Sequence, residues 1–234
     1  MKKKITAIVQ ARVGSSRLKG KVLKKIKGKE IIIKLLERLS RSKKIDDIVV
    51  AIPKKKEDDT LFEALKKYRY KVFRGEELNV LKRFYDCAKK NNIDNILRIT
   101  GDCPLIDPKL IDKIINVYQK KKVDYLSNVE NRTFPDGMDI ELFSFEALSL
   151  ANSLVKSNFD KEHVTSYFLR SNKFNKFNFE KKGENYSNLR ITLDTPQDFQ
   201  LIKTIYKSFK NNFFDLDDII KFYNKNKRIF NQNI

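Results

Sequence analysis

The sequence is poor in the residues that build disulfides and metal centres, with two cysteines and one histidine among 234 residues. Cys87 and Cys103 fit neither a disulfide framework nor the spacing of metal ligands. No apolar run approaches the roughly 18 to 20 residues needed to span a bilayer. The apolar run near the start is too short for a signal peptide, and Gln10 and Arg12 interrupt it. We therefore expect a protein of the reducing cytoplasm without a membrane span.

Several patterns of known chemistry are also missing. The chain has no Walker A spacing and no G-x-G-x-x-G fingerprint. It has no serine-histidine-aspartate arrangement and no cysteine-nucleophile motif. Internal repeats and low-complexity linkers are absent too, so we predict one domain over residues 1–234. A hydrophobic content of 41% predicts that this domain is folded and globular.

The net charge of +20 suggests two classes of protein. A basic balance can indicate a nucleic-acid or anionic-membrane partner. However, 38 of the 50 cationic residues are Lys, they are scattered, and no aromatic-interleaved basic motif of the RNA-binding type is present. We therefore favour a solvated surface with no specific nucleic-acid partner. A basic, non-catalytic nucleic-acid-binding or regulatory protein remains the alternative from another class.

Short apolar, β-branched runs alternate with segments of helical period in the first half of the chain. The expected strands span 5–11, 47–52, 71–75, 95–104 and 124–128. The expected helices span 30–42, 58–68, 79–92 and 107–122. This alternation predicts an α/β fold with a mostly parallel sheet and helices on both faces. Ligands of such folds bind outside the carboxyl ends of the strands.

The pattern changes after residue 130. Residues 134–148 predict a loop, a strand and a short helix, and 161–171 predict a helix. Alternating strand signals at 177–182 and 188–196 predict a smaller antiparallel portion. Two further helices are expected over 196–209 and 215–227.

The loop that follows the first expected strand concentrates three cations. Small residues at 14–16 let backbone N–H groups approach a phosphate closely. Arg12, Arg17 and Lys21 would then supply charge-assisted hydrogen bonds to phosphate oxygens. The same residues also fit a solvated loop in a Lys-rich protein, and spacing alone does not decide between the two interpretations.

Carboxylates follow two later strand signals. Asp102 lies just past the strand end, where it could hold Mg²⁺ together with substrate phosphates, or form an Asx turn. Asp107 fits better as the N-cap of the next helix. Asp194 precedes Thr195-Pro196, an ordinary helix start, and becomes a metal candidate only in combination with Asp102. His163, the only histidine, is either a general base or a structural residue within a helix.

Six blocks of the sequence, in order, resemble the cytidylyltransferases that make CMP-activated sugar acids, and the spore-coat-polysaccharide branch most of all. The blocks are IVQARVGSSRLKGKVL (8–23), FRGEELNVLKRFYDCAK (73–89), RITGDCPLIDP (98–108), FPDGMDIELFSFEAL (134–148), KEHVTSYF (161–168) and LRITLDTPQDF (189–199). One position departs from the family pattern, because Lys19 stands where that loop usually has proline. The change costs loop rigidity but removes no cationic contact.

The resemblance implies a three-layer, Rossmann-like nucleotide-diphospho-sugar-transferase fold that uses CTP and Mg²⁺. It implies a nucleotide-binding part (1–130), an acceptor-binding and dimerisation part (131–195) and C-terminal helices (196–234). A homodimer is therefore a candidate assembly. The implied activity transfers CMP from CTP to a sugar acid or phosphorylated small metabolite, with release of pyrophosphate, for surface-glycan biosynthesis. The same fold acting on GTP or UTP is an alternative.

The resemblance also assigns residues to roles. The nucleotide-binding candidates are Ala11, Arg12, Gly14, Ser15, Ser16, Arg17, Lys21, Arg83 and Asp102, with Arg83 near the base. Catalysis is assigned to Arg12, Lys21 and Asp102. Asp102 and Asp194 would hold the metal. The acceptor-binding candidates are Arg98, Asp136, Asp139, Glu141 and His163.

Overall fold

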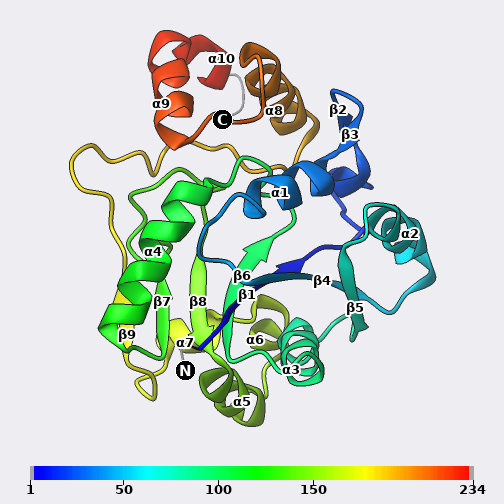
Figure 1. Cartoon of the computed structure of the whole chain (residues 1–234), viewed down its shortest axis with the longest axis vertical. Helices are drawn as coiled ribbons and strands as arrows, with labels where there is room; N and C mark the ends of the chain where they lie inside the picture. The colour runs from blue at the N-terminus through cyan, green and yellow to red at the C-terminus, as the bar shows by residue number, and fades with distance from the viewer. Residues whose placement is uncertain (1–2, 232–234) are drawn as a thin grey trace.

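The computed structural model describes residues 3–231, which form an α/β fold around a seven-stranded sheet (Figure 1). The strand order is β5-β4-β1-β6-β8-β7-β9. Strands β5, β4, β1 and β6 run parallel to one another, whereas β8 is antiparallel to both of its neighbours. The predicted mostly parallel sheet with a smaller antiparallel portion is therefore confirmed.

The parallel half follows the alternation predicted from the sequence. Its strands are β1 (Ile5–Gln10), β4 (Asp47–Pro53), β5 (Lys71–Gly75) and β6 (Asn95–Thr100). Its helices are α1 (Ile31–Leu39), α2 (Asp59–Lys67), α3 (Val80–Lys90) and α4 (Pro108–Lys121). Strand β1 lies between β4 and β6, and five of its six residues are buried. Because helices cover both faces, β1 reads as a continuous apolar run rather than an alternating one.

Short elements fill the connections on either side of α1 and α2. The loop after β1 leads into η1 (Lys21–Leu23) and the small hairpin of β2 (Lys25–Ile26) and β3 (Lys29–Glu30). A second short turn, η2 (Lys56–Asp58), precedes α2. These connections leave the loop after β1 at the carboxyl edge of the sheet.

The C-terminal helices are tied to the sheet domain by two buried polar side chains. Asp107 caps α4, as predicted, and its second oxygen accepts from the backbone N–H of Leu216 at 3.2 Å. Arg38 of α1 donates to the carbonyl oxygens of Ile106 at 2.7 Å and Phe214 at 2.9 Å. The helices held in this way are α8 (Pro196–Ser208), α9 (Leu216–Lys225) and α10 (Lys227–Asn231).

Two strand predictions in the second half were wrong, one in the direction of its pairing and the other in predicting a strand at all. The strands there are β7 (Tyr125–Ser127), β8 (Glu141–Ser144) and β9 (Lys176–Asn178), and β9 pairs parallel with β7. Residues 188–196 form no strand, only one parallel bridge between Asp136 and Arg190. The reason is that their backbone bonds are divided between two segments. Ile191 N–H donates to the Asp136 carbonyl and Leu193 N–H to the Asp102 carbonyl, both at 2.8 Å.

The helix predicted over 161–171 is two short helices that follow α5 (Phe145–Leu154). These are α6 (Asn158–His163) and α7 (Ser166–Arg170). The chain breaks at Val164, which is fully buried and has φ 55°. A β-branched residue rarely adopts this backbone conformation, so local propensity gave no sign of the break.

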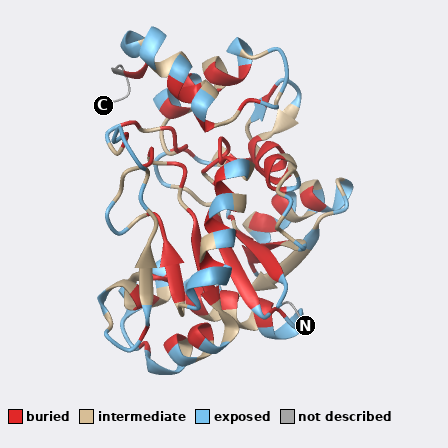
Figure 2. Ribbon diagram, turned by 60° about the vertical axis from the view of Figure 1, so that its left-hand side comes forward, coloured by how far each residue is buried: buried red, intermediate tan, exposed pale blue. Residues whose placement is uncertain are grey.

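The helices cover the two faces of the sheet with separate apolar clusters. One cluster joins α1, α2, α4, α8 and α9 to the sheet, and the other joins α3, α5 and α7 to its opposite face. Figure 2 shows the buried strands between these two helical layers. Within residues 3–231, no helix is both long and apolar enough to cross a bilayer.

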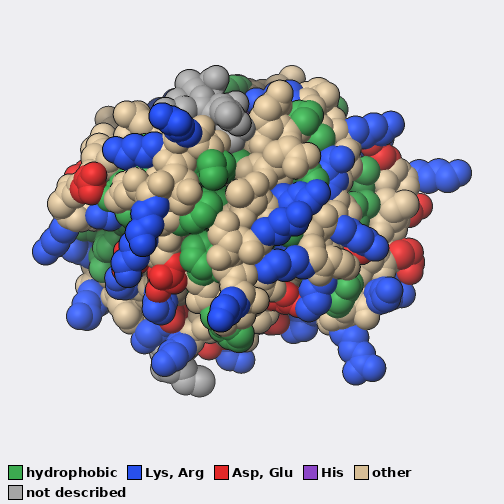
Figure 3. All heavy atoms as spheres, turned by 90° about the horizontal axis from the view of Figure 1, so that it is seen from above, with side chains coloured by type: hydrophobic (Ala, Val, Ile, Leu, Met, Phe, Trp, Pro, Cys, Tyr) green, Lys and Arg blue, Asp and Glu red, His purple; other side chains and the backbone are tan. Residues whose placement is uncertain are grey.

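The excess positive charge is spread widely over the face at the α8–α10 end of the molecule. Figure 3 shows Lys and Arg side chains over and around this face, with acidic and apolar side chains between them. No single basic groove is visible on the described part of this face. The distribution on this face favours a solvated surface over a nucleic-acid footprint.

Candidate active site

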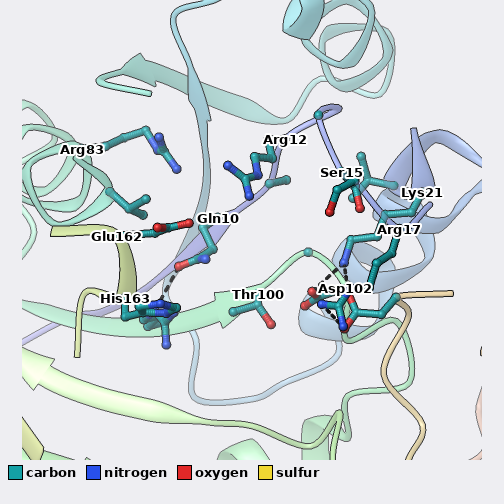
Figure 4. A pocket seen from close by; sticks show the side chains of 18 residues that line it. Gln10, Arg12, Ser15, Arg17, Lys21, Arg83, Thr100, Asp102, Glu162 and His163 are labelled. Atoms are coloured by element: carbon teal, nitrogen blue, oxygen red, sulfur yellow. Dashed lines mark hydrogen bonds and ion pairs between the residues drawn. The ribbon is translucent and has the colours of Figure 1, made fainter. Parts of the chain in front are cut away.

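A pocket lies at the carboxyl ends of β1 and β6, where the loops after these strands meet the segment before α8 (Figure 4). Every predicted nucleotide-binding residue lines it, and so do Arg98, His163 and Asp194. Asp136, Asp139 and Glu141 do not line it. Sequence reasoning missed other lining residues, namely Gln10, Val22, Val80, Thr100, Gly101 and Glu162.

The loop after β1 is held in place by the buried carboxylate of Asp58, at the end of η2. Asp58 Oδ1 accepts from the Val13 N–H at 2.7 Å, and the side chain of Asp58 makes no helix-cap bond. Burial raises the pKa of Asp58, against the effect of this hydrogen bond. Gly20, at φ 66°, then turns the chain into η1 and returns its N–H to the Val13 carbonyl at 3.1 Å.

Lys21 joins the two predicted metal ligands. Its Nζ contacts Asp102 Oδ2 at 2.8 Å, Asp194 Oδ1 at 2.7 Å and the Leu193 carbonyl at 2.8 Å. Burial lowers the pKa of Lys21, but the two carboxylates outweigh this and raise it above its usual value. Burial likewise opposes ionisation of Asp194, yet Lys21 and the neighbouring arginines lower its pKa. Lys21 and Asp194 are therefore charged at neutral pH.

Arg190 holds Asp194 from behind the pocket. Its Nη2 lies 3.2 Å from Asp194 Oδ2, while its Nη1 donates to Asp136 Oδ2 at 2.7 Å. It also contacts both oxygens of Asp198, which is 1% exposed. Asp198 accepts from the backbone N–H groups of Asp194 and Thr195 at 2.8 Å and forms a capping box with Thr195. Asp198 and Arg190 thus fix the direction of Asp194, and sequence reasoning named neither.

Arg12 and Arg83 are the two guanidiniums of the lining that form no ion pair within residues 3–231. Arg83 is 3% exposed, and its Nη1 donates to the carbonyl oxygens of Glu76 and Glu77. Burial, and then the charge of Arg12, lowers the pKa of Arg83 to about 10. Two guanidiniums that repel each other across a pocket favour an anionic ligand between them.

Arg98 is fixed on the pocket floor by a buried ion pair. Its Nη1 contacts Glu141, and its Nε donates to Gln10 Oε1 at 3.0 Å. Glu141 also accepts from the Tyr125 hydroxyl at 2.6 Å. Because Arg98 has only donors, Gln10 must turn its oxygen toward it and keep its amide NH₂ for other partners. The predicted acceptor residue Glu141 is therefore a support beneath Arg98.

The break at Val164 places Glu162 and His163 at the rim of the pocket, where both are exposed (Figure 4). His163 packs on Phe159 with ring centroids 4.4 Å apart. Asp160 stabilises the chain break at Val164 through its contacts with Arg170, Ser157 and Ser166. The structure thus puts His163 at the C-terminal end of α6, where it lines the pocket.

The two remaining acceptor candidates contact arginines outside the pocket lining. Asp136 pairs with Arg190, as described above, and Asp139 pairs with Arg132 at 2.5 Å. Burial and then the charge of Asp139 raise the pKa of Asp136, although Arg190 opposes this. Neither carboxylate lines the pocket, so neither is positioned to contact an acceptor there directly.

The chemistry of the donor set suits a hard divalent cation. Two carboxylates and a carbonyl oxygen converge on the Lys21 ammonium. Within residues 3–231 no group of three or more His, Cys, Asp or Glu side chains could hold a metal ion by itself. Mg²⁺ does not require such a group, since it usually binds through one or two carboxylates, substrate phosphates and water. Asp102 and Asp194 therefore fit the predicted ion only together with a phosphate ligand.

Residues 6–234 match the sequence model of a family described as cytidylyltransferase. An uncharacterised protein of Methanocaldococcus jannaschii is 42% identical, with 98% of this chain and 94% of that protein aligned. The spore coat polysaccharide biosynthesis protein SpsF of Bacillus subtilis is 31% identical over 95% of each chain. A solved structure of a cytidylyltransferase from Leptospira borgpetersenii is 35% identical, with a TM-score of 0.93 over 98% of this chain and 97% of that chain.

Proposed function

The chain belongs to the cytidylyltransferase family, and from this premise we propose that it transfers CMP from CTP to a small anionic acceptor and releases pyrophosphate. The observation that carries the proposal is the meeting of the cationic loop with Asp102 and Asp194 in one pocket. The acceptor class we propose is a sugar acid or a phosphorylated small metabolite, for surface-glycan biosynthesis. The name of the Bacillus relative supports that setting.

Arg12, Arg17 and Lys21 bind the triphosphate in this proposal. Ser15 and Ser16 lie on the same loop and line the same pocket, where their N–H and hydroxyl groups can donate to phosphate oxygens. Asp58 keeps this loop against the sheet edge. The guanidinium of Arg12, which forms no ion pair within the described part of the chain, would neutralise charge that builds on the leaving pyrophosphate.

The reaction is an in-line attack of an acceptor oxygen on the α-phosphorus of CTP. The bond between the α-phosphorus and the bridging oxygen breaks, and pyrophosphate leaves with the bonding electrons. Such a transfer depends on positioning and charge neutralisation and needs no covalent enzyme nucleophile. This agrees with a pocket lining that contains no cysteine among the described residues: Cys103, next to Asp102 in the chain, is buried, and burial raises the pKa of its thiol.

Asp102 and Asp194 are the residues that would hold Mg²⁺, which would neutralise phosphate charge when bound. Arg190 and Asp198 keep Asp194 in its orientation. Arg98 and the amide NH₂ of Gln10 offer fixed donors on the pocket floor, suited to an anionic acceptor. His163 and Glu162, at the rim, are within the pocket lining and are candidates to accept the proton of the attacking hydroxyl.

A pyrophosphate-release screen tests the proposal directly. CTP, GTP and UTP would each be combined with a panel of sugar acids and sugar phosphates in the presence of Mg²⁺. We expect release with CTP and at least one anionic acceptor. Release with GTP or UTP alone would overturn the choice of nucleotide, and no release with any pair would overturn the proposed reaction.

A further inference from the structure

We propose that Lys21 occupies the cation position of this site in the free protein, and that a triphosphate must draw Lys21 away before a divalent cation binds. The proposal rests on the proposed function, because it takes the triphosphate as the ligand that competes for Lys21. It makes the loop after β1 a gate on cation binding as well as a phosphate-binding loop.

The contacts of Lys21 are those of a bound cation. An ammonium group has three donors, and all three are used, by Asp102 Oδ2, Asp194 Oδ1 and the Leu193 carbonyl at 2.7–2.8 Å. Two carboxylates and a carbonyl are also the oxygen ligands that hard divalent cations prefer. The Lys21 side chain is only 12% exposed, so the ammonium fills this cradle instead of extending into solvent.

The carboxylate of Asp194 is fully engaged in this state. Lys21 takes Oδ1, while Arg17 at 3.0 Å and Arg190 at 3.2 Å take Oδ2. Lys21 and Arg17 thus match the two negative charges of Asp102 and Asp194, and Arg190, which also pairs with Asp136 and Asp198, adds a third cation beside Asp194. A divalent cation would meet like charges at close range and would gain no free carboxylate oxygen from Asp194.

The three cations differ in how readily they can leave. Arg190 lies outside the pocket lining and is also bound by Asp136 and Asp198. Arg17 and Lys21, in contrast, belong to the loop after β1, and the Arg17 side chain is 66% exposed. Phosphate oxygens in the pocket would compete for these two groups and leave Arg190 in place. Coupling of this kind is reciprocal, so displacement of Lys21 by phosphate raises cation affinity.

Substitution Lys21→Met tests the gate without nucleotide, because it keeps an apolar stem and removes the ammonium. Mn²⁺ binding to the nucleotide-free protein would be measured by electron paramagnetic resonance titration. We expect Lys21→Met to bind Mn²⁺ roughly tenfold or more tightly than the wild type does. Lys19→Met is the matched control on the same loop, since Lys19 is exposed and forms no ion pair among the described residues. It should bind Mn²⁺ as the wild type does.

Further variants decide whether any gain in Mn²⁺ affinity arises at the oxygen atoms that contact Lys21. Adding Asp102→Asn to Lys21→Met should return Mn²⁺ binding to the wild-type level. Lys21→Gln should reproduce the gain, and circular dichroism would confirm that each variant is folded. The wild type should still bind CTP in EDTA. Equal Mn²⁺ affinity of the wild type and both Lys21 variants, or CTP binding that requires Mn²⁺, would overturn the gate.

The experiments distinguish failure of the Lys21 proposal from failure of the proposed function. Wild-type protein that releases pyrophosphate from CTP, with no gain of Mn²⁺ affinity in either Lys21 variant, would remove the gate and keep the enzyme. A gain in both variants, with no wild-type turnover of any nucleotide, would keep Lys21 in the cation position and remove the triphosphate as its competitor.

Discussion

At one end of the pocket, Lys21 pairs with two partly exposed carboxylates, Asp102 and Asp194, and Asp194 also pairs with Arg17 and Arg190. At the other end, Arg98 pairs with the buried carboxylate of Glu141. The first arrangement can exchange partners, because phosphate groups can replace the carboxylates around loop cations. The second cannot do so at low cost, because separating a buried ion pair leaves a desolvated charge. Substitutions at the first end should therefore change activity, and substitutions at the second end should change stability.

The largest effect is expected from Asp102→Asn. The substitution leaves Lys21 with one carboxylate instead of two and removes half of the predicted metal ligands. Turnover should fall by about 10²-fold or more, in the range seen when one charge-stabilising group is lost. Pyrophosphate release measures turnover, and thermal unfolding shows whether the fold is kept. Asp86→Asn is a suitable control, because within residues 3–231 Asp86 pairs only with Lys82, one turn away on α3. Near-normal turnover in Asp102→Asn would contradict its role.

The Lys21 end of the pocket, where ion pairs can exchange, was also the end that the sequence predicted better. Arg12, Arg17 and Lys21 lie in the connection that follows β1, and Asp102 lies in the one that follows β6; parallel strands bring their carboxyl ends to one edge. This placement depends only on chain order, so it can be predicted without contacts. The supports of the same end were not found. Asp58, Arg190 and Asp198 support the site through tertiary contacts. In the sequence they look like ordinary helix starts and strand residues.

The buried end was predicted less well, for a physical reason. Glu141 was expected to contact the acceptor, but the register that pairs it with Arg98 across β6 and β8 turns it beneath the pocket. The helix break beside His163 depends on Val164 at φ 55°, a conformation that local propensity opposes. The first feature depends on strand register and the second on the tertiary packing around the buried Val164, and neither follows from local sequence.

Glu141→Gln tests the Arg98 end of the pocket through its effect on the free energy of unfolding. It leaves the Arg98 charge buried without a carboxylate and weakens the acceptor of the Tyr125 hydroxyl. Breaking such a pair should lower the free energy of unfolding by about 3 kcal/mol. Urea unfolding measures this loss. Asp139→Asn provides the matched control, because its pair with Arg132 is nearly a third exposed and should contribute about 1 kcal/mol or less. Equal losses in the two variants would contradict the distinction.

Acid should loosen the rim that carries His163. Arg170, and then the serine hydroxyls of 157 and 166, outweigh burial and hold the pKa of Asp160 well below its usual value of 3.8. A carboxyl with a lowered folded-state pKa stabilises the fold above its unfolded pKa, and this contribution is lost as pH falls through the folded value. Asp160→Asn should therefore be less stable than the wild type at pH 7, and the two unfolding free energies should converge below about pH 4. A difference that stays constant from pH 7 to pH 2 would contradict this assignment.

The smallest effect is expected at Lys19, the position where the loop after β1 departs from the family pattern. Its backbone N–H donates to no backbone carbonyl among the described residues, and the next two N–H groups already close the turn onto Val13 and Leu18. Lys19→Pro should therefore restrict the unfolded chain without removing a bond, and raise the free energy of unfolding by about 0.4–1 kcal/mol. Urea unfolding would measure the gain, with turnover unchanged because no cationic contact is lost. A fall in stability would show instead that the loop holds Lys19 in a conformation that proline cannot adopt.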